Sequence, residues 1–153
     1  MLKKSLKSWL DDYGASHQHP VNKAIHWVCV PVILWTLLAL IWPIQLGVSP
    51  WINLCTAFML FCLWFYARLS WPITIGMAAI ALISVALIQW HLHQVSWPLW
   101  QTALTLFVLA WIGQFIGHKI EGKRPSFFED LQFLLIGPAW LLSFVYRRLG
   151  IRY

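Results

Sequence analysis

Long apolar stretches separated by short polar segments dominate the chain. Asp, Glu, Lys and Arg are absent between Trp27 and Ala67, and again between Arg68 and Lys119. Each stretch is long enough for about two membrane-spanning helices at roughly 20 residues per span. Tryptophans and prolines mark the segment ends, as is common at a membrane interface. The pattern therefore predicts four spans at about 27–46, 51–67, 72–90 and 97–117.

A shorter segment before the first span has the period of an amphipathic helix. Apolar residues recur at helical spacing in residues 2–13, and Lys and Asp occupy the remaining positions. Such a helix lies on the membrane surface. The segment contains no apolar stretch suited to a cleavable signal peptide, so we expect insertion to begin with the first span.

The last apolar segment, residues 131–146, is about 16 residues long and contains Gly137-Pro138. This length is short for a crossing, and proline interrupts helical hydrogen bonding, so we predict an interfacial or re-entrant helix. Ser126 and Glu129 have the spacing of a capping box ahead of it. Glu129 is therefore interpreted as a helix-start residue and not as a catalytic one.

Composition excludes a soluble globule. Of the 153 residues, 60% are hydrophobic and 10% are charged, whereas soluble domains carry about 25% charged residues. A domain of this size has too little interior for 12 Trp and nine Phe beside its aliphatic residues. Cys29, Cys55 and Cys62 show no CxxC spacing, which argues against a disulfide framework or a zinc site. We predict a single all-α integral membrane domain over residues 1–153.

The charges give the orientation. The net charge is +6, and Lys and Arg lie at segment ends that four spans would place on one side, whereas the connections 47–50 and 91–96 have none. Both termini are then cytoplasmic, in a membrane of the bacterial inner-membrane or endoplasmic-reticulum type. These charges fit lipid headgroups, and no nucleic-acid partner is expected.

Six histidines are the chemical signal in so apolar a chain. His17, His19, His26 and His118 lie at cytoplasmic span ends, and His91 and His93 lie at the far ends. About 30 Å of hydrocarbon separates the two faces, so the far pair cannot share a metal ion with His118. That pair is interpreted as solvent-facing loop residues in preference to a weak metal or haem site.

Two polar clusters share the cytoplasmic face. In the first, Asn22 and His26 are four residues apart, so the amide can orient the imidazole as groups around a metal site do; the alternative is an interfacial histidine satisfied by backbone or water. In the second, Gln114, His118 and Glu121 form one helical stripe.

Gly113 and Gly117 lie beside the second cluster and allow another helix, including one from a second copy, to approach closely. The second cluster therefore has an alternative role as a helix-packing surface, on which Glu121 forms an ion pair with Arg124 or a lysine.

Joint metal coordination by His17, His26 and His118 is geometrically open, with Glu121 as a fourth ligand or an outer base. Imidazole with carboxylate and without thiolate suits non-haem Fe(II), although zinc also accepts such ligands. Membrane di-iron enzymes need HxxxH and HxxHH boxes, which this chain lacks. A mononuclear site fits better.

The motifs resemble a known family. YxxxH at Tyr13, PxNxxxH at Pro20 with a later Pro31, and QFIGHxxEGxxP from Gln114, ahead of a Gly-Pro break, resemble the family typified by the yeast endoplasmic-reticulum 2-hydroxy fatty acid dioxygenase. The match covers Tyr13 to Pro138 and departs at Cys29, where the family often has Gly. It implies an enzyme that uses Fe²⁺ and O₂ to shorten a 2-hydroxy fatty acid by one carbon, with His17, His26 and His118 as its motif histidines.

That chemistry assigns roles to the remaining polar residues. A 2-hydroxy acid can chelate iron through hydroxyl and carboxylate oxygens while its acyl chain lies between the spans. Glu121 is the catalytic candidate. The substrate-binding candidates, which offset carboxylate charge, are Lys119, Lys123 and Arg124, and the candidates around the metal ligands are Tyr13, Asn22 and Gln114.

Two other function classes remain open. A non-catalytic membrane module would bind lipid or a partner helix through the face that carries Gly113 and Gly117, and it would be stable without metal. The hypothesis of a transporter is the weaker of the two, because the predicted spans have no ionisable residue near their centres.

Overall fold

The protein is all-helical. The computed structural model describes residues 4–124 and 132–153, and within them the backbone forms helices plus one isolated bridge between Gln45 and Asn53. This confirms the predicted fold class. The predicted capping box at Ser126 and Glu129 lies outside the described residues.

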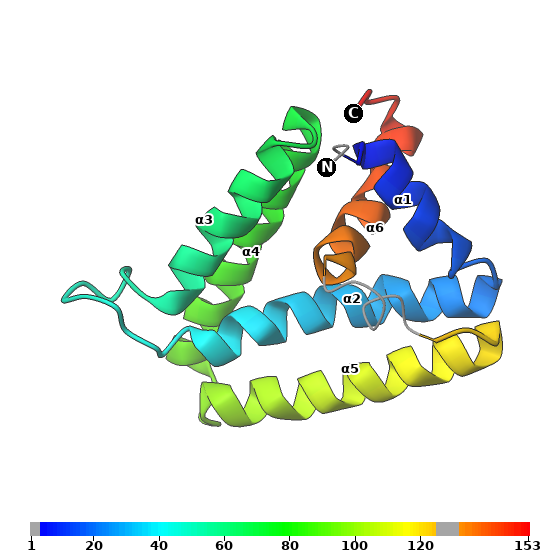
Figure 1. The fold of residues 1–153 in the computed structure, drawn as a ribbon. Helices are drawn as coiled ribbons and strands as arrows, with labels where there is room; N and C mark the ends of the chain where they lie inside the picture. The colour runs from blue at the N-terminus through cyan, green and yellow to red at the C-terminus, as the bar shows by residue number, and fades with distance from the viewer. Residues whose placement is uncertain (1–3, 125–131) are drawn as a thin grey trace.

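Two antiparallel helix pairs organise the molecule (Figure 1). Helix α2 (Pro20–Ile41) packs along α5 (Leu99–Glu121), and α3 (Leu54–Ala67) forms a hairpin with α4 (Trp71–Gln94). The α3–α4 hairpin rises at an angle from the α2–α5 pair. Helices α2 and α5 are therefore direct neighbours although they are distant in the sequence.

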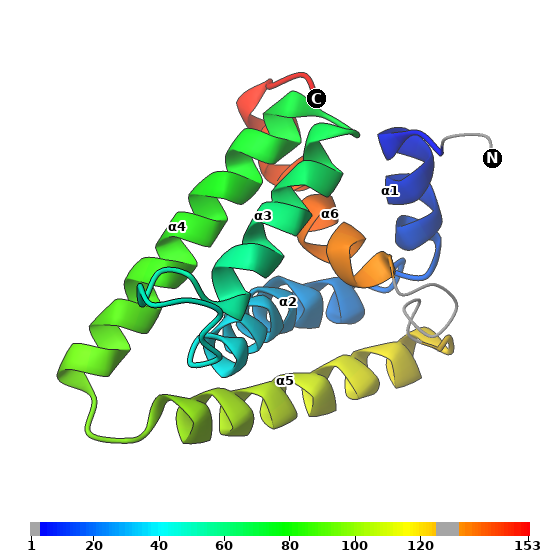
Figure 2. The same ribbon diagram turned by 60° about the vertical axis from the view of Figure 1, so that its left-hand side comes forward.

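Two further helices complete the fold. Helix α1 (Leu6–Ala15) packs on α6 (Phe133–Leu149), and α6 also contacts α2 and α4. Figure 2 shows α1 and α6 at the same end of the molecule as the start of α2. The α1–α2 connection is thereby held against the rest of the protein.

Three helices, α2, α4 and α5, are long and apolar enough to cross a membrane, and α3 is a shorter apolar helix. The 14 residues of α3 extend about 21 Å at 1.5 Å per residue, less than the roughly 30 Å of hydrocarbon. Large apolar side chains point outward, with Val28 66% and Leu82 72% exposed. Such a surface is suited to lipid.

The helix boundaries differ from the predicted spans. Helix α2 covers Pro20–Ile41 instead of 27–46, because its polar first turns are buried against protein and are helical although they are not apolar. Proline at the first position of α2 starts the helix without losing a hydrogen bond. Helix α3 begins at Leu54 instead of residue 51, because the Asn53 side chain accepts a hydrogen bond from the Thr56 N–H and caps the helix.

The observed ends of the other helices also differ from the predicted ends by a few residues. Helix α1 begins at Leu6 instead of residue 2, because Ser5 caps it. The α4 and α5 helices extend to Gln94 and Glu121, beyond the predicted 90 and 117. The short last segment forms α6 through Leu149 instead of ending at 146, and Gly150 ends it in the left-handed conformation.

The interpretation of His91 as a solvent-facing loop residue was wrong. Helix α4 continues through it, and the side chain is 4% exposed with Nε2 2.9 Å from the Thr102 hydroxyl. Only His93 of the pair is exposed. Thr102 precedes His118 on α5 by sixteen residues, about 24 Å, so the predicted separation of His91 from His118 is confirmed.

Candidate metal centre and its cavity

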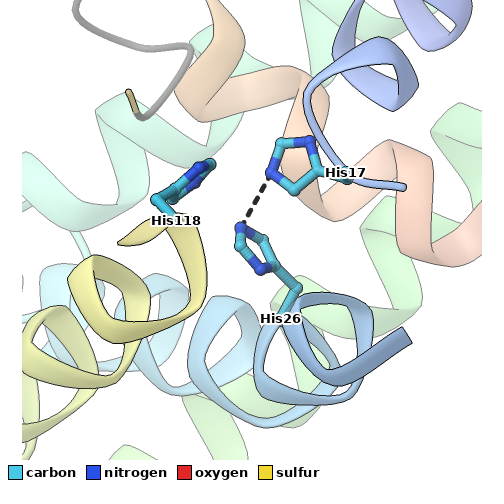
Figure 3. Close-up of side chains that lie close together, drawn as sticks. All are labelled: His17, His26 and His118. Atoms are coloured by element: carbon cyan, nitrogen blue, oxygen red, sulfur yellow. Dashed lines mark hydrogen bonds between the residues drawn. The ribbon is translucent and has the colours of Figure 1, made fainter. Parts of the chain in front are cut away.

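Three buried histidines meet at one point (Figure 3). His17 lies in the α1–α2 connection, His26 in the second turn of α2, and His118 in the last turn of α5. Each offers one ligand atom, and these atoms lie within 4.8 Å of one another. The side chains are 1%, 1% and 4% exposed, respectively. The tertiary structure thus assembles the set that the sequence left geometrically open.

Backbone carbonyls fix the orientation of two of these rings. The His17 Nδ1 lies 2.6 Å from the carbonyl oxygen of Tyr13, and the His26 Nδ1 lies 2.9 Å from that of Asn22. A carbonyl can only accept, so each Nδ1 carries the hydrogen, and each Nε2 of the neutral rings keeps a bare lone pair. This is the arrangement that usually prepares imidazole for a metal ion.

The two bare nitrogens face each other. The His17 and His26 Nε2 atoms are 2.9 Å apart, a distance at which two lone pairs repel unless a cation lies beside them. A proton is a poor candidate for this cation. Burial is the larger cause and the neighbouring His26 the second, and together they lower the pKa of His17 to about 3. Two ligand nitrogens about 2.1 Å from a metal ion are about 3.0 Å apart when they bind at right angles and about 3.4 Å apart in a tetrahedral site. The donor set therefore fits a divalent metal ion.

Aromatic rings immobilise His17. The Tyr13 ring stacks on it at 4.2 Å between centroids with an interplanar angle of 9°, and the Trp140 ring lies 5.3 Å away. Burial raises the pKa of the Tyr13 phenol, so the phenol stays neutral. Tyr13 thus lies beside the site. It contacts His17 through its backbone carbonyl and through the face of its ring.

Asn22 contributes differently from the prediction. Its backbone carbonyl, and not its amide, orients His26. The amide nitrogen instead donates to Glu121 Oε2 at 3.0 Å, and the side chain is fully buried. Asn22 therefore connects the His26 turn to the end of α5.

Glu121 binds the chain segment that carries His17. Its Oε1 accepts the Gln18 N–H at 2.7 Å, and its Oε2 accepts the His19 N–H at 2.8 Å. Both carboxylate oxygens are thus occupied, and Glu121 is not part of the three-histidine group found among the described residues. The carboxylate ties the α1–α2 connection to α5, so we call its four-residue arrangement with Gln18, His19 and Asn22 the carboxylate latch.

The other predicted polar residues lie outside the ligand set. His19 caps α2, with its Nδ1 accepting the Val21 N–H. The Lys123 amino group donates to the Ala15 carbonyl at 2.7 Å, which adds a second tie to the α1–α2 connection. Lys119 and Arg124 are exposed, and none of the three predicted basic residues lines the cavity described below.

The face that carries Gly113 and Gly117 is covered by α2 of the same chain. A Cβ at Gly113 would meet the Cys29 sulfur at 2.7 Å, and one at Gly117 would collide with the Asn22 side chain. This close approach brings His26 and His118 together. The helix that the glycines admit therefore belongs to this chain, which takes away the surface on which a non-catalytic docking module depended.

An apolar cavity of about 420 Å³ begins at the histidines. His26, His118 and Gln114 line its polar end, and the rest of its wall is almost entirely apolar. Gln114 is 5% exposed, and its Oε1 has no hydrogen-bond partner within residues 4–124 and 132–153. A cavity of this volume is in the range that holds small ligands, and Gln114 offers a buried acceptor to such a ligand.

Comparison with known proteins identifies the family of this chain. Residues 3–149 match the family described as 2-hydroxy-palmitic acid dioxygenase Mpo1-like. The chain belongs to this Mpo1-like family. It is 30% identical over 148 residues to the Saccharomyces cerevisiae protein named 2-hydroxy-palmitic acid dioxygenase MPO1, covering 95% of this chain and 82% of the yeast protein. No solved structure matches the chain.

Sequence reasoning missed two contributors to this Mpo1-like site. Trp140 packs on His17 and Tyr13, yet in the sequence it is one of 12 tryptophans. Gln18 reaches the latch through its backbone N–H, which any residue except proline supplies. Gly137 was the available signal for the first, because a glycine there lets α6 approach the Tyr13 ring.

Proposed function

We propose that this protein is an Fe(II)-dependent dioxygenase that converts a 2-hydroxy fatty acid into the fatty acid one carbon shorter. The observation that carries the proposal is the buried three-histidine group at the polar end of an apolar cavity. The yeast relative is named as a dioxygenase of 2-hydroxy-palmitic acid, and the resemblance in the motifs points to the same chemistry.

His17, His26 and His118 would hold the metal ion. Bound Fe(II) supplies the reactivity toward O₂ that no protein side chain has, and three protein ligands leave positions for other oxygen donors. The two backbone carbonyls keep the His17 and His26 rings in the ligating tautomer. The carboxylate latch keeps the His17 segment against α5.

The cavity would bind the acyl chain, and Gln114 would bind the polar head. A carbonyl oxygen of an amide accepts a hydrogen bond, so Gln114 Oε1 can accept the hydrogen of the 2-hydroxyl group. Lys119 and Arg124 act from outside the cavity, where their charge favours approach of a carboxylate. The outward-facing apolar side chains support a reaction at a membrane. We propose the cytoplasmic face, and labelling of a single cysteine at position 68 from outside the cell would contradict this.

The proposal is tested on protein purified without oxygen and loaded with Fe(II). We expect about one iron per chain, oxygen uptake that depends on 2-hydroxypalmitic acid, and a product one carbon shorter by mass spectrometry. Palmitic acid, which lacks the hydroxyl, is the matched control and should give no uptake. A protein that is stable, binds no iron and consumes no oxygen would support the non-catalytic module instead, and activity with zinc alone would contradict the choice of metal.

Gln114→Leu should weaken discrimination between hydroxylated and plain fatty acids. The variant keeps the approximate size of the side chain but removes the acceptor, and a buried hydrogen bond of this kind contributes about 1 kcal/mol, or roughly fivefold in affinity. The measurement is the ratio of dissociation constants for 2-hydroxypalmitic and palmitic acid on anaerobic iron-loaded protein. Gln101→Leu, on the same helix and outside the cavity, should leave the ratio unchanged. An unchanged ratio in Gln114→Leu would contradict this role.

A further inference from the structure

The apolar cavity extends away from the histidines into the core of the protein. The core of the described residues forms two clusters. One includes Tyr13, Tyr66 and Met77 near the metal centre. The other includes Leu38, and Phe58 and Met59 pack against it. Both clusters contribute to the cavity wall, so the cavity extends from the first to the second.

The length of this cavity can be read along α2. Its lining positions run from His26 through Val30, Leu34 and Leu38 on one helix face. His26 and Leu38 are twelve residues apart, which corresponds to about 18 Å at 1.5 Å per residue. Leu38 is 2% exposed. Phe58 and Met59 of α3 are half-buried beside it, and Leu38 is the lining residue of α2 that lies farthest along the helix from His26.

Resting on the proposed function, we propose that Leu38, Phe58 and Met59 form a floor that sets the longest acyl chain the enzyme accepts. An extended acyl chain advances about 1.25 Å per C–C bond, because bonds of about 1.52 Å meet at about 111°, so about 18 Å accommodates roughly 14 bonds. The occupant is a single saturated acyl chain of that length whose 2-hydroxy acid head lies at the histidines. Longer chains would meet the floor before the head reaches the metal site.

The wall chemistry supports an acyl chain as the occupant. The polar side chains in the cavity wall are the two histidines, Gln114, Gln132 and the ends of Tyr13, Tyr66 and Trp111, and the other lining residues are aliphatic, aromatic or sulfur-containing, apart from Gly137. A methylene chain gains about fourfold in affinity for each methylene that it buries. Affinity should therefore rise with chain length until the floor is reached, and then stop rising or fall.

The test uses 2-hydroxymyristic, 2-hydroxypalmitic, 2-hydroxystearic and 2-hydroxyarachidic acids. Binding is measured by calorimetry on anaerobic iron-loaded protein, and oxygen uptake is measured separately. Wild type should bind 2-hydroxypalmitic acid about 15-fold more tightly than 2-hydroxymyristic acid, and 2-hydroxyarachidic acid no more tightly than 2-hydroxypalmitic acid. Met59→Ala removes part of the floor and should move the preferred chain about two methylenes longer. Leu60→Ala, the next residue on α3, is 63% exposed and outside the cavity, and it should keep the wild-type preference.

A second variant fills the cavity from α4 and protects the test against misfolding of the first. Ala81 lines the cavity between Met77 and Val85, which pack on the two different clusters. Ala81→Leu should therefore move the preference toward 2-hydroxymyristic acid. Identical preferences in Met59→Ala, Ala81→Leu and wild type would overturn the floor while the proposed reaction stands. A wild type that neither binds these acids nor consumes oxygen with them would overturn the proposed function itself.

Discussion

His118→Ala is expected to abolish most metal binding, and alanine at His17 or His26 is expected to do the same. Their ligand atoms lie within 4.8 Å of one another, so the loss of one leaves two donors in a buried site built for three. We expect a decrease of more than about 100-fold in metal affinity, because the loss of an outer group alone typically costs 10 to 100-fold. The measurement is iron per chain after anaerobic purification, with helical content followed by circular dichroism.

The remaining histidines provide matched controls for this experiment. His93 is exposed at the C-terminal end of α4. His93→Ala should therefore retain full iron content and stability. His91→Ala should also retain full iron content, but the lost hydrogen bond to Thr102 should lower the free energy of unfolding by about 1 kcal/mol. Full iron occupancy in His118→Ala would disprove the assignment of the three ligands.

Glu121→Gln is expected to reduce metal affinity or turnover about 10 to 100-fold in a protein that remains folded. The carboxylate accepts two backbone N–H groups and the Asn22 amide. Glutamine keeps the size but supplies one acceptor oxygen and turns an N–H₂ group toward N–H donors. The segment that carries His17 then loses its attachment to α5. Metal affinity and oxygen uptake with 2-hydroxypalmitic acid are measured on the same preparation.

Asp11→Asn is the control, because Asp11 is an exposed carboxylate on α1 and lines no part of the cavity. If Glu121 were only a surface charge, its substitution would cost about 0 to 1 kcal/mol of stability and no activity. Wild-type affinity and turnover in Glu121→Gln would show that the latch is structural and that the histidines alone build the site. Lost turnover with unchanged metal affinity would instead place Glu121 in the chemistry.

The precision of the span prediction depended on what each residue faces. Hydrophobicity alone started the first span at Trp27, but the helix begins at Pro20 because Asn22 and His26 are buried against α5. The last apolar segment was predicted to be a short helix interrupted at Gly137-Pro138, but α6 continues through both residues, because a proline removes one N–H from the helix without having to end it. The pattern of apolar residues predicts which helical turns contact lipid. It therefore misses turns that contact protein through polar side chains.

The neighbours of the candidate ligands were predicted less well than the ligands. His17, His26 and His118 could be grouped because charge placed all three at one membrane face. The sequence could not show that Asn22 orients His26 through its carbonyl, or that Glu121 holds backbone N–H groups more than 100 residues earlier. Backbone groups carry no residue-specific signal, so such bonds are visible only once the chain is folded.

The sequence by itself determined the membrane class, the common face of three histidines and the close approach of a helix at Gly113 and Gly117, because hydrophobic period, charge and side-chain size are local properties. The tertiary structure decided which helix makes that approach, how closely His17 and His26 meet, and which residues of α2, from His26 to Leu38, line the cavity. These features depend on how α2 packs against α5 and on how the α3–α4 hairpin crosses that pair. Side-chain packing between helices far apart in sequence fixes both.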